Sequence, residues 1–232
     1  MLIILPPSET KATGGTGPSL TESALSTLSF PALNPVRNEI MDVLEHEVIQ
    51  APHAKVNAEL TTSPTMPSIL RYTGVLYDAL DAASLPEESW KNVAIGSALF
   101  GVSMAGDLIP TYRYSPTTKL AGLNNATPKK LWGKTLASTL EDMPEELVLD
   151  LRSGAYQQLG PVKRGITMKV VTESGRVVNH WNKQSKGIFT RVMCESGELD
   201  ALTQIDDVLD IARAAGLDVE YDPGLLTLTT EG

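Results

Sequence analysis

The sequence is poor in cysteine, histidine and aromatic residues. Its 232 residues include one cysteine, three histidines and 5% aromatic side chains. The single thiol, Cys194, cannot form an internal disulfide, which fits a reducing compartment. It ends the apolar run 188–194, so we expect a buried structural thiol rather than a redox sensor. With no second cysteine and no histidine cluster, the sequence predicts neither a metal site nor a cofactor.

Long apolar runs are also missing. No run approaches the roughly 20 residues that a membrane-spanning helix needs. The start of the chain is apolar for only a few residues before Pro6 and Pro7, and it has no basic region or cleavage site of a secretory signal. We therefore expect a cytoplasmic protein with no membrane partner. The chain also lacks a G-x-x-x-x-G-K-[ST] phosphate loop and an H-E-x-x-H zinc motif. No pattern in it defines an oligomeric state.

Positive charge is scarce overall but concentrated in one segment. The chain has 19 basic and 28 acidic residues, for a net charge of -9. Residues 152–191 nevertheless hold eight basic residues and one acidic residue, and residues 192–232 hold ten acidic residues and one basic residue. A cationic segment within an acidic protein indicates a local site for an anionic partner. The alternative interpretation is an exposed basic face that pairs with the acidic C-terminal segment.

Hydrophobic patterning predicts a mixed α/β (α+β) fold. Apolar runs predict strands at 2–5, 93–95 and 147–151, and Asn34-Pro35 and Thr127-Pro128 carry the cap-plus-proline pattern that begins a helix. The other expected elements are helices at 34–50, 69–80, 127–143, 184–194 and 199–215, strands at 111–114, near 219 and at 225–229, a hairpin of 165–172 with 176–181, and a connection at 101–110. Without a repeat or a linker, we expect one domain, 1–232, with a central mixed sheet flanked by helices. Its segment 191–232 is an acidic helix-plus-strand region of the same domain.

Polar side chains follow each of the three predicted core strands. Ser8, Glu9 and Lys11 follow the first strand, and Ser97 follows the second. Arg152 and Ser153 follow the third. If these strands are parallel neighbours, their carboxyl ends form one crevice, which is where open α/β sheets bind ligands. Connections and the basic segment would add Tyr112, Arg113, Tyr156, Lys183, Lys186 and Arg191.

Such a crevice would suit an anion, because guanidinium and ammonium groups bind carboxylate and phosphate. The residues assigned to substrate or anion binding are Ser8, Ser97, Tyr112, Arg113, Arg152, Ser153, Tyr156, Lys183 and Arg191. Lys11 and Lys186 are candidate bases or covalent amines if burial or neighbouring cations lower their pKa. Glu9 is the candidate carboxylate for proton transfer. The alternative for any one of them is a helix cap or a surface charge.

Several blocks of the sequence keep a fixed order across residues 1–194. They are 1–11, 72–77, 96–102, 107–113, 131–133, 150–156 and 182–191. In this order they resemble the YaaA family, peroxide stress proteins of bacteria. The resemblance implies a cytosolic protein of mixed α/β fold that limits iron-driven oxidative damage during hydrogen peroxide stress. It also implies DNA binding through a helix-hairpin-helix-like element, and it attaches no particular enzymatic reaction.

Two molecular functions follow from these observations. The first is DNA binding by the basic residues Arg152, Lys163, Arg164, Lys169, Arg176, Lys183, Lys186 and Arg191, with Trp181 available for stacking. The second is an enzyme or small-molecule binder that acts on an anionic substrate in the Ser/Lys/Arg-lined crevice. A local cationic segment in an acidic protein favours a pocket-sized ligand over a long duplex.

Overall fold

The fold is built on two β-sheets. The computed structural model describes residues 1–21, 25–46, 54–175 and 179–230. The strands are β1 (Leu2–Leu5), β2 (Met66–Pro67), β3 (Val93–Ser97), β4 (Gly101–Met104), β5 (Leu108–Ile109), β6 (Val148–Asp150), β7 (Ile166–Thr172), β8 (Asp218–Asp222) and β9 (Leu225–Thr230). Seven of them form one sheet in the order β4-β3-β1-β6-β7-β9-β8, and β2 pairs with β5.

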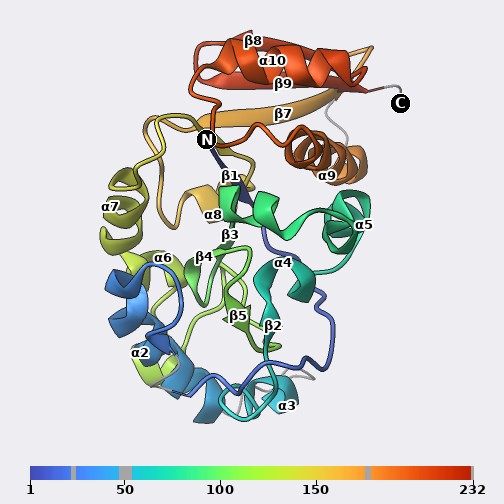
Figure 1. Ribbon diagram of the computed structural model, residues 1–232. Helices are drawn as coiled ribbons and strands as arrows, with labels where there is room; N and C mark the ends of the chain where they lie inside the picture. Colours follow the sequence, from blue (N-terminus) through green and yellow to red (C-terminus); the bar gives the residue numbers. More distant parts are fainter. Residues whose placement is uncertain (22–24, 47–53, 176–178, 231–232) are drawn as a thin grey trace.

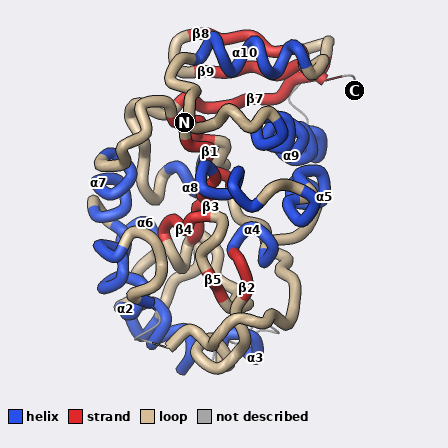
Figure 2. The backbone as a smooth tube through the Cα atoms, in the orientation of Figure 1, coloured by secondary structure: helices blue, strands red, loops and turns tan. Residues whose placement is uncertain are grey.

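The large sheet has a parallel centre and antiparallel edges. The five central strands β3, β1, β6, β7 and β9, adjacent in this order, run parallel to one another. The edge strands β4 and β8 are antiparallel to β3 and β9. Helices cover the sheet, as Figures 1 and 2 show. The structure thus confirms the predicted class, a mixed sheet flanked by helices.

The helices are short apart from three. The α-helices of the described residues are α2 (Asn34–His46), α3 (Ala54–Asn57), α4 (Ser68–Arg71), α5 (Val75–Leu80), α6 (Pro128–Trp132), α7 (Thr135–Glu141), α8 (Gly154–Gln157), α9 (Asn179–Glu195) and α10 (Ile205–Ala214). Short 3-10 helices are η1 (Pro31–Leu33), η2 (Ala82–Ser84), η3 (Glu87–Asn92) and η4 (Ala121–Leu123). Helix α9 packs against α5 and β7, and α10 packs on β8 (Figure 1). No helix in the described part of the chain is both long and apolar enough to cross a membrane.

Strand β1 occupies the middle of the core. All four of its side chains are buried, because β1 is paired on both edges and covered on both faces. Parallel strands of this kind consist of continuous apolar residues, which is why the run 2–5 was recognisable. Pro6 and Pro7 follow directly, and proline cannot donate a hydrogen bond to a neighbouring strand. The chain therefore leaves the sheet where the predicted polar loop begins.

Two predicted helices are interrupted by glycine. The helix expected at 69–80 is divided into α4 and α5 by Gly74, whose φ is 95°. The helix expected at 127–143 is divided into α6 and α7 by Gly133, whose φ is 51°. Both values lie in a region that L side chains rarely adopt, so each glycine permits a change of chain direction. The apolar periodicity correctly predicted helix on both sides of each glycine, but it did not predict the interruption of the helix at the glycine.

Other element predictions were wrong because pairing depends on tertiary structure. Residues 101–110 contain β4 and β5 rather than a connection, and 111–114 contain no strand. The hairpin of 165–172 with 176–181 does not form, since residues 179–181 belong to α9 and β7 pairs with β9. Residues 176–178 lie outside the described residues. The hairpin of this region is instead β8 with β9, with Gly224 at its turn (φ 83°).

We expect Gly187→Ala to destabilise the protein by about 1–3 kcal/mol, the usual range for overpacking. A Cβ on Gly187 would lie 2.2 Å from Leu76 O and 2.9 Å from Ala79 Cβ, at the contact between α9 and α5. Urea unfolding measures the loss. The matched control is Gly106→Ala, because a Cβ there meets no atom within 4 Å, and its free energy of unfolding should change by less than about 0.5 kcal/mol. Equal effects of the two substitutions would contradict this account.

Candidate functional site

The carboxyl ends of three parallel strands lie side by side. Strand β1 pairs in parallel with β3 on one edge and with β6 on the other. The segments that follow these strands therefore leave the sheet at the same edge, which is the condition for the predicted crevice. One of these segments carries Ser8, Glu9 and Lys11, the second follows Ser97, and the third carries Arg152.

Ser97 begins a chain of three buried hydroxyl groups. Its Oγ accepts hydrogen bonds from the backbone N–H groups of Leu99 (3.1 Å) and Phe100 (3.0 Å). Ser97 Oγ lies 2.7 Å from Tyr112 Oη, which in turn lies 2.7 Å from Tyr72 Oη. Burial raises the pKa of both phenols far above the usual value, so both keep their protons at neutral pH.

The amine of Lys11 lies over the two tyrosine rings. Its Nζ is 4.2 Å from the ring centroid of Tyr112 and 5.2 Å from that of Tyr72, so it makes cation–π contacts when protonated. Nζ donates a hydrogen bond to Ser8 O (3.0 Å) and a longer one to Glu9 O (3.5 Å). Both acceptors are backbone carbonyl groups, which leave the charge of the ammonium unneutralised.

Burial is the main influence on the protonation of Lys11. Burial, and next the positive charge of Arg113, lower the pKa of Lys11 to about 7, while Glu9 opposes the shift. A lysine with this pKa is substantially neutral at neutral pH. A neutral amine can accept a proton or attack an electrophile, which an ammonium cannot.

The loop that carries Lys11 is fastened to the segment that carries Tyr72. Ser8 Oγ accepts a hydrogen bond from Thr73 N (3.1 Å) and donates one to Thr10 O. Lys11 and Tyr72 form an isolated antiparallel bridge. Because the same two segments supply the amine and a phenol, their relative position is fixed by backbone contacts.

Arg113 and Tyr156 lie beside this cluster. The side chain of Asn57 is fully buried, accepts a hydrogen bond from Arg113 N (2.8 Å) and donates one to Arg113 O (2.8 Å). This clamp fixes the backbone of Arg113, whose half-buried side chain acts electrostatically on Lys11. Burial raises the pKa of Tyr156, and Tyr112 and Glu9 raise it further, so Tyr156 also stays protonated.

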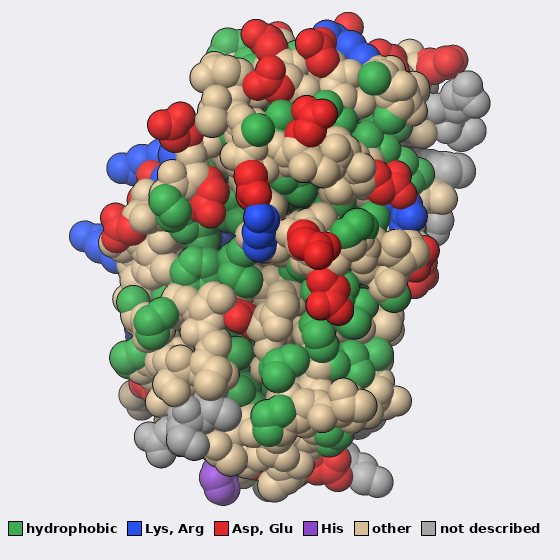
Figure 3. All heavy atoms as spheres, viewed as in Figure 1, with side chains coloured by type: hydrophobic (Ala, Val, Ile, Leu, Met, Phe, Trp, Pro, Cys, Tyr) green, Lys and Arg blue, Asp and Glu red, His purple; other side chains and the backbone are tan. Residues whose placement is uncertain are grey.

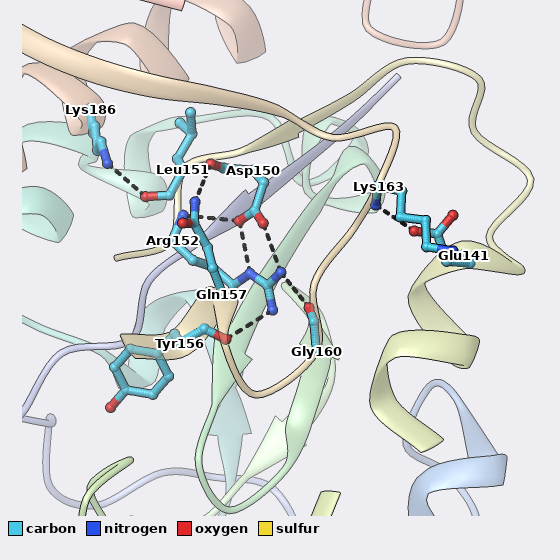
Figure 4. A network of polar contacts seen from close by, with 9 residues as sticks. All are labelled: Glu141, Asp150, Leu151, Arg152, Tyr156, Gln157, Gly160, Lys163 and Lys186. Carbon is cyan, nitrogen blue, oxygen red and sulfur yellow. Dashed lines mark hydrogen bonds and ion pairs between the residues drawn. The ribbon is translucent and has the colours of Figure 1, made fainter. Parts of the chain in front are cut away.

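Arg152 is used inside the protein. Its Nε and Nη2 bind the two carboxylate oxygens of Asp150 at 2.8 and 2.7 Å, and Nη2 also donates to Gly160 O (2.8 Å), as Figure 4 shows. Arg152 Nη1 donates to Tyr156 O (3.3 Å). The side chain crosses over Gly96, where any Cβ would lie 2.5 Å from Arg152 Cδ. A guanidinium held in this way positions the loop after β6, and its hydrogen-bonding capacity is largely taken up.

Lys186 also faces inward. Its Nζ donates to Leu151 O (2.9 Å) from α9 (Figure 4), and its residue is 7% exposed. Burial lowers the pKa of Lys186 to about 8, and Asp150 opposes the shift. This amine therefore joins α9 to the residue that follows β6. Its carbonyl acceptor differs from the two carbonyl groups that Lys11 binds.

The three remaining predicted residues lie further out. Ser153 is exposed at the start of α8, and its side chain makes no capping hydrogen bond. Lys183 is exposed on α9. Arg191 donates to Leu80 O (3.0 Å) and pairs with Glu195 (2.8 Å), so it fastens α9 to the end of α5. The structure thus gathers Ser8, Glu9, Lys11, Ser97, Tyr112, Arg113 and Tyr156, and leaves Arg191 on a helix contact.

Tyr72 and Asn57 belong to the cluster but were not predicted. Tyr72 stands in the block 72–77 that carried the family resemblance, and it is one of only six tyrosines in the chain. The rarity of tyrosine in this sequence was the signal that could have marked Tyr72 as a candidate site residue. Asn57 lies in a polar segment without helical or strand periodicity. No sequence pattern predicts its two hydrogen bonds to the backbone of Arg113.

The His, Cys, Asp and Glu side chains of the described residues bear on metal and redox chemistry. No group of three or more His, Cys, Asp or Glu side chains among them is arranged to hold a metal ion. Cys194 is buried, and burial raises the pKa of its thiol to about 11. Because the thiolate is the reactive form, this cysteine is a structural thiol at neutral pH, as predicted.

The fold and the cluster define an α/β protein with a polar site at the carboxyl edge of a parallel sheet. The sequence profile of the family described as "Peroxide stress protein YaaA" matches residues 1–219, so the chain belongs to this family and the predicted resemblance is confirmed. A UPF0246 protein of Corynebacterium glutamicum (strain R) is 49% identical over 96% of both chains. A UPF0246 protein of Streptomyces coelicolor is 33% identical over 96% of this chain and 93% of the relative.

Ser97→Ala should lower the free energy of unfolding by about 1–3 kcal/mol or more, because it leaves two buried backbone N–H groups without an acceptor. Urea unfolding at neutral pH measures the change. Ser153→Ala is the matched control, because Ser153 also follows a core strand but is exposed and its side chain makes no capping hydrogen bond. It should change stability by less than about 0.5 kcal/mol. A stable Ser97→Ala protein would show that the hydroxyl chain does not hold the loop after β3.

Lys11 should react with an amine-acylating reagent at lower pH than the exposed lysines do. Only the neutral amine is acylated, so labelling rises as pH passes upward through the pKa, which is about 7 for Lys11. Exposed lysines ordinarily have a pKa of about 10.4, so the peptide that carries exposed Lys130 serves as the reference. Pulse labelling over a pH series with peptide mass spectrometry measures both in one sample. Parallel titration curves for the two lysines would contradict a neutral amine at the site.

Proposed function

We propose that the protein acts in the cytoplasm in the response to hydrogen peroxide, where it limits iron-driven oxidative damage by binding a small anion at Lys11 and Arg113. Membership of the peroxide stress family supports the general role. The observation that supports the anion site is that Lys11, in the segment after β1, and Arg113 beside it form no ion pair with a described carboxylate.

Four other cationic side chains of the described residues form ion pairs with carboxylates, whereas exposed lysines such as Lys129 and Lys130 form none and are surrounded by water. The ion pairs are Lys91 with Asp200, Arg152 with Asp150, Arg164 with Glu141, and Arg191 with Asp81 and Glu195. Lys11 contacts carbonyl groups and aromatic faces instead. A bound anion favours the protonated form of Lys11, which then adds its positive charge, partly withdrawn from water, to that of Arg113. The same cluster would serve an enzyme for an anionic substrate, with Lys11 as base or amine and Glu9 as proton-transfer carboxylate.

The cationic residues 152–191 give less support to DNA binding. Arg152 and Lys186 are buried, and Arg164 donates to Glu141 O (2.7 Å) and Met143 O (2.8 Å) at the end of α7. Arg176 lies outside the described residues, as does the side chain of Trp181. On the face in Figure 3, Lys and Arg side chains are few and scattered, and Asp and Glu are spread over the upper part. Duplex binding requires many exposed cations along one track.

The expected helix-hairpin-helix-like element also finds little support. The triplet Ala121-Gly122-Leu123 has the apolar-Gly-apolar pattern typical of such a hairpin, but it forms η4, a single 3-10 turn ahead of α6. Residues 112–119 before it contain no helix. Gly122 instead packs on α2, where a Cβ would lie 2.9 Å from Val43 Cγ1. We therefore place a small anion ahead of DNA as the ligand.

Calorimetric titration with inorganic phosphate and with propionate tests the anion site. Lys11→Met and Arg113→Gln should each weaken binding by about tenfold or more, because a hydrogen bond to a charged group contributes about 1.5–3 kcal/mol. Lys130→Ala, which removes an exposed lysine of α6, should bind as the unchanged protein does. The proposal would be refuted if neither anion bound to the unchanged protein. It would also be refuted if both anions bound to the Lys11 and Arg113 variants as tightly as to the unchanged protein. Salt-sensitive binding of a duplex oligonucleotide in their place would favour DNA.

A survival assay connects the site with the stress response. Cells that lack the chromosomal gene would carry the unchanged protein, Lys11→Met or Lys130→Ala, and be exposed to hydrogen peroxide. At equal protein level, we expect the unchanged protein and Lys130→Ala to restore survival, and Lys11→Met not to restore it. Full survival with Lys11→Met would separate the stress role from this site.

A further inference from the structure

The three hydroxyl groups of the site contain one hydrogen more than their contacts can use. Ser97 Oγ accepts two backbone N–H groups, which occupy both lone pairs of the oxygen. Ser97 must therefore donate its own hydrogen to Tyr112, the hydroxyl at 2.7 Å. The remaining contact, Tyr112 with Tyr72, uses one hydrogen. Tyr72 also interacts with the Ser97 hydroxyl, but both lone pairs of that oxygen are already occupied, so one phenolic O–H is left without a full acceptor.

This spare donor is buried and neutral. Tyr72 and Tyr112 are each 2% exposed, so bulk water does not satisfy the group. A buried donor without an acceptor is costly, and such groups in native structures mark a place for a ligand or an ordered water. If the chain runs from Ser97 through Tyr112, the spare hydrogen is on Tyr72, and each donation polarises the next hydroxyl.

The Lys11 amine lies at the same place and has no carboxylate partner. The Lys11 amine sits over the face of Tyr112, the ring whose hydroxyl belongs to the chain. The amine and the hydroxyl chain therefore share the Tyr112 ring, which places a phenolic proton donor beside the nitrogen. Arg113 supplies a fixed positive charge nearby. Amine, proton donor and cation together match a molecule that has both a carbonyl group and a carboxylate.

We propose that Lys11 condenses with the carbonyl group of a small oxo acid to form an imine, with the Tyr72–Tyr112 pair as the proton donor and Arg113 as the carboxylate-binding cation. The inference rests on the proposed anion site and adds to it the class of ligand and a covalent step. It goes beyond reversible anion binding, which needs neither a neutral amine nor a spare phenolic hydrogen.

The step is balanced without an oxidant or reductant. The lone pair of Nζ forms the N–C bond, and the π electrons of the carbonyl group move to oxygen, which takes the phenolic proton. A proton lost from nitrogen restores the phenol. The resulting carbinolamine then loses its hydroxyl group and the last proton on nitrogen as one water, and leaves a C=N bond. The phenol donates to the departing hydroxyl in this stage as well.

Reductive trapping tests the inference on the full chain. The protein would be incubated with pyruvate or glyoxylate and sodium cyanoborohydride, which reduces an imine to a stable secondary amine, and the adduct located by peptide mass spectrometry. We expect one dominant adduct, on Lys11, and none there with Lys11→Met. Acetaldehyde, which lacks the carboxylate, should label Lys11 at least tenfold less. The exposed lysines Lys129, Lys130 and Lys163 are internal controls.

The phenol pair has its own test. Tyr72→Phe/Tyr112→Phe should slow trapping at Lys11 by about tenfold or more, in line with the contribution of general acids. Tyr77→Phe is the matched control, because its buried hydroxyl donates to Pro6 O (2.8 Å) and stands outside the chain. It should trap at the original rate. Circular dichroism confirms that each variant is folded, and if the double variant is not, Tyr72→Phe alone replaces it with the same expected direction.

The outcomes separate the two proposals. Adducts distributed over lysines according to exposure, or no adduct on Lys11 while propionate still binds, would overturn the imine and leave the anion site standing. Absence of both trapping and propionate binding would overturn both. Trapping at Lys11 that the double tyrosine variant leaves unchanged would overturn the role of the phenols.

Discussion

Buried backbone carbonyl groups that no strand or helix can satisfy are the constraint on which this structure depends. The segments between the parallel strands are long and run through the interior, so their carbonyl groups need donors. Three fully buried or nearly buried arginines supply them: Arg37 binds Phe100 O and Val102 O, Arg71 binds Ala12 O and Pro64 O, and Arg152 binds Gly160 O. A guanidinium suits this task because its five N–H groups diverge from a rigid plane and it stays charged.

The same constraint creates the candidate site. Arg71 ties Ala12 and Pro64 together and so holds the loop of Lys11 beside Tyr72. Burial lowers the pKa of Lys11 most, and the positive charges of Arg113 and Arg71 lower it further. Lys11 thus becomes a weak base as a consequence of how the loop is held. The same buried arginine contacts that hold the loop in place therefore also lower the basicity of the Lys11 amine.

The sequence predicted the elements whose pattern is local. The strand at 2–5 is apolar on both faces, and the polar residues after each core strand mark where the chain leaves the sheet. The functions of individual cations were not predictable in this way. Arg152 follows a strand as Lys11 does, yet its guanidinium is consumed by Asp150 and two carbonyl groups. Which carbonyl groups lack a partner is a property of the assembled chain, so it leaves no periodic signal.

The net charge of -9 gains a different meaning from this arrangement. Acidic residues are abundant on α10 and β8, whereas the edge where β1, β3 and β6 end holds cations. A protein that is acidic elsewhere repels anions in general and admits one only where positive charge is left unneutralised. Four of the seven described cations of residues 152–191 bind internal carbonyl groups or carboxylates, so segment charge alone overstated the anion-binding surface; they are Arg152, Arg164, Lys186 and Arg191. What remains is small, half-buried and next to a spare phenolic hydrogen, which favours a compact ligand with an oxygen acceptor over a polyanion.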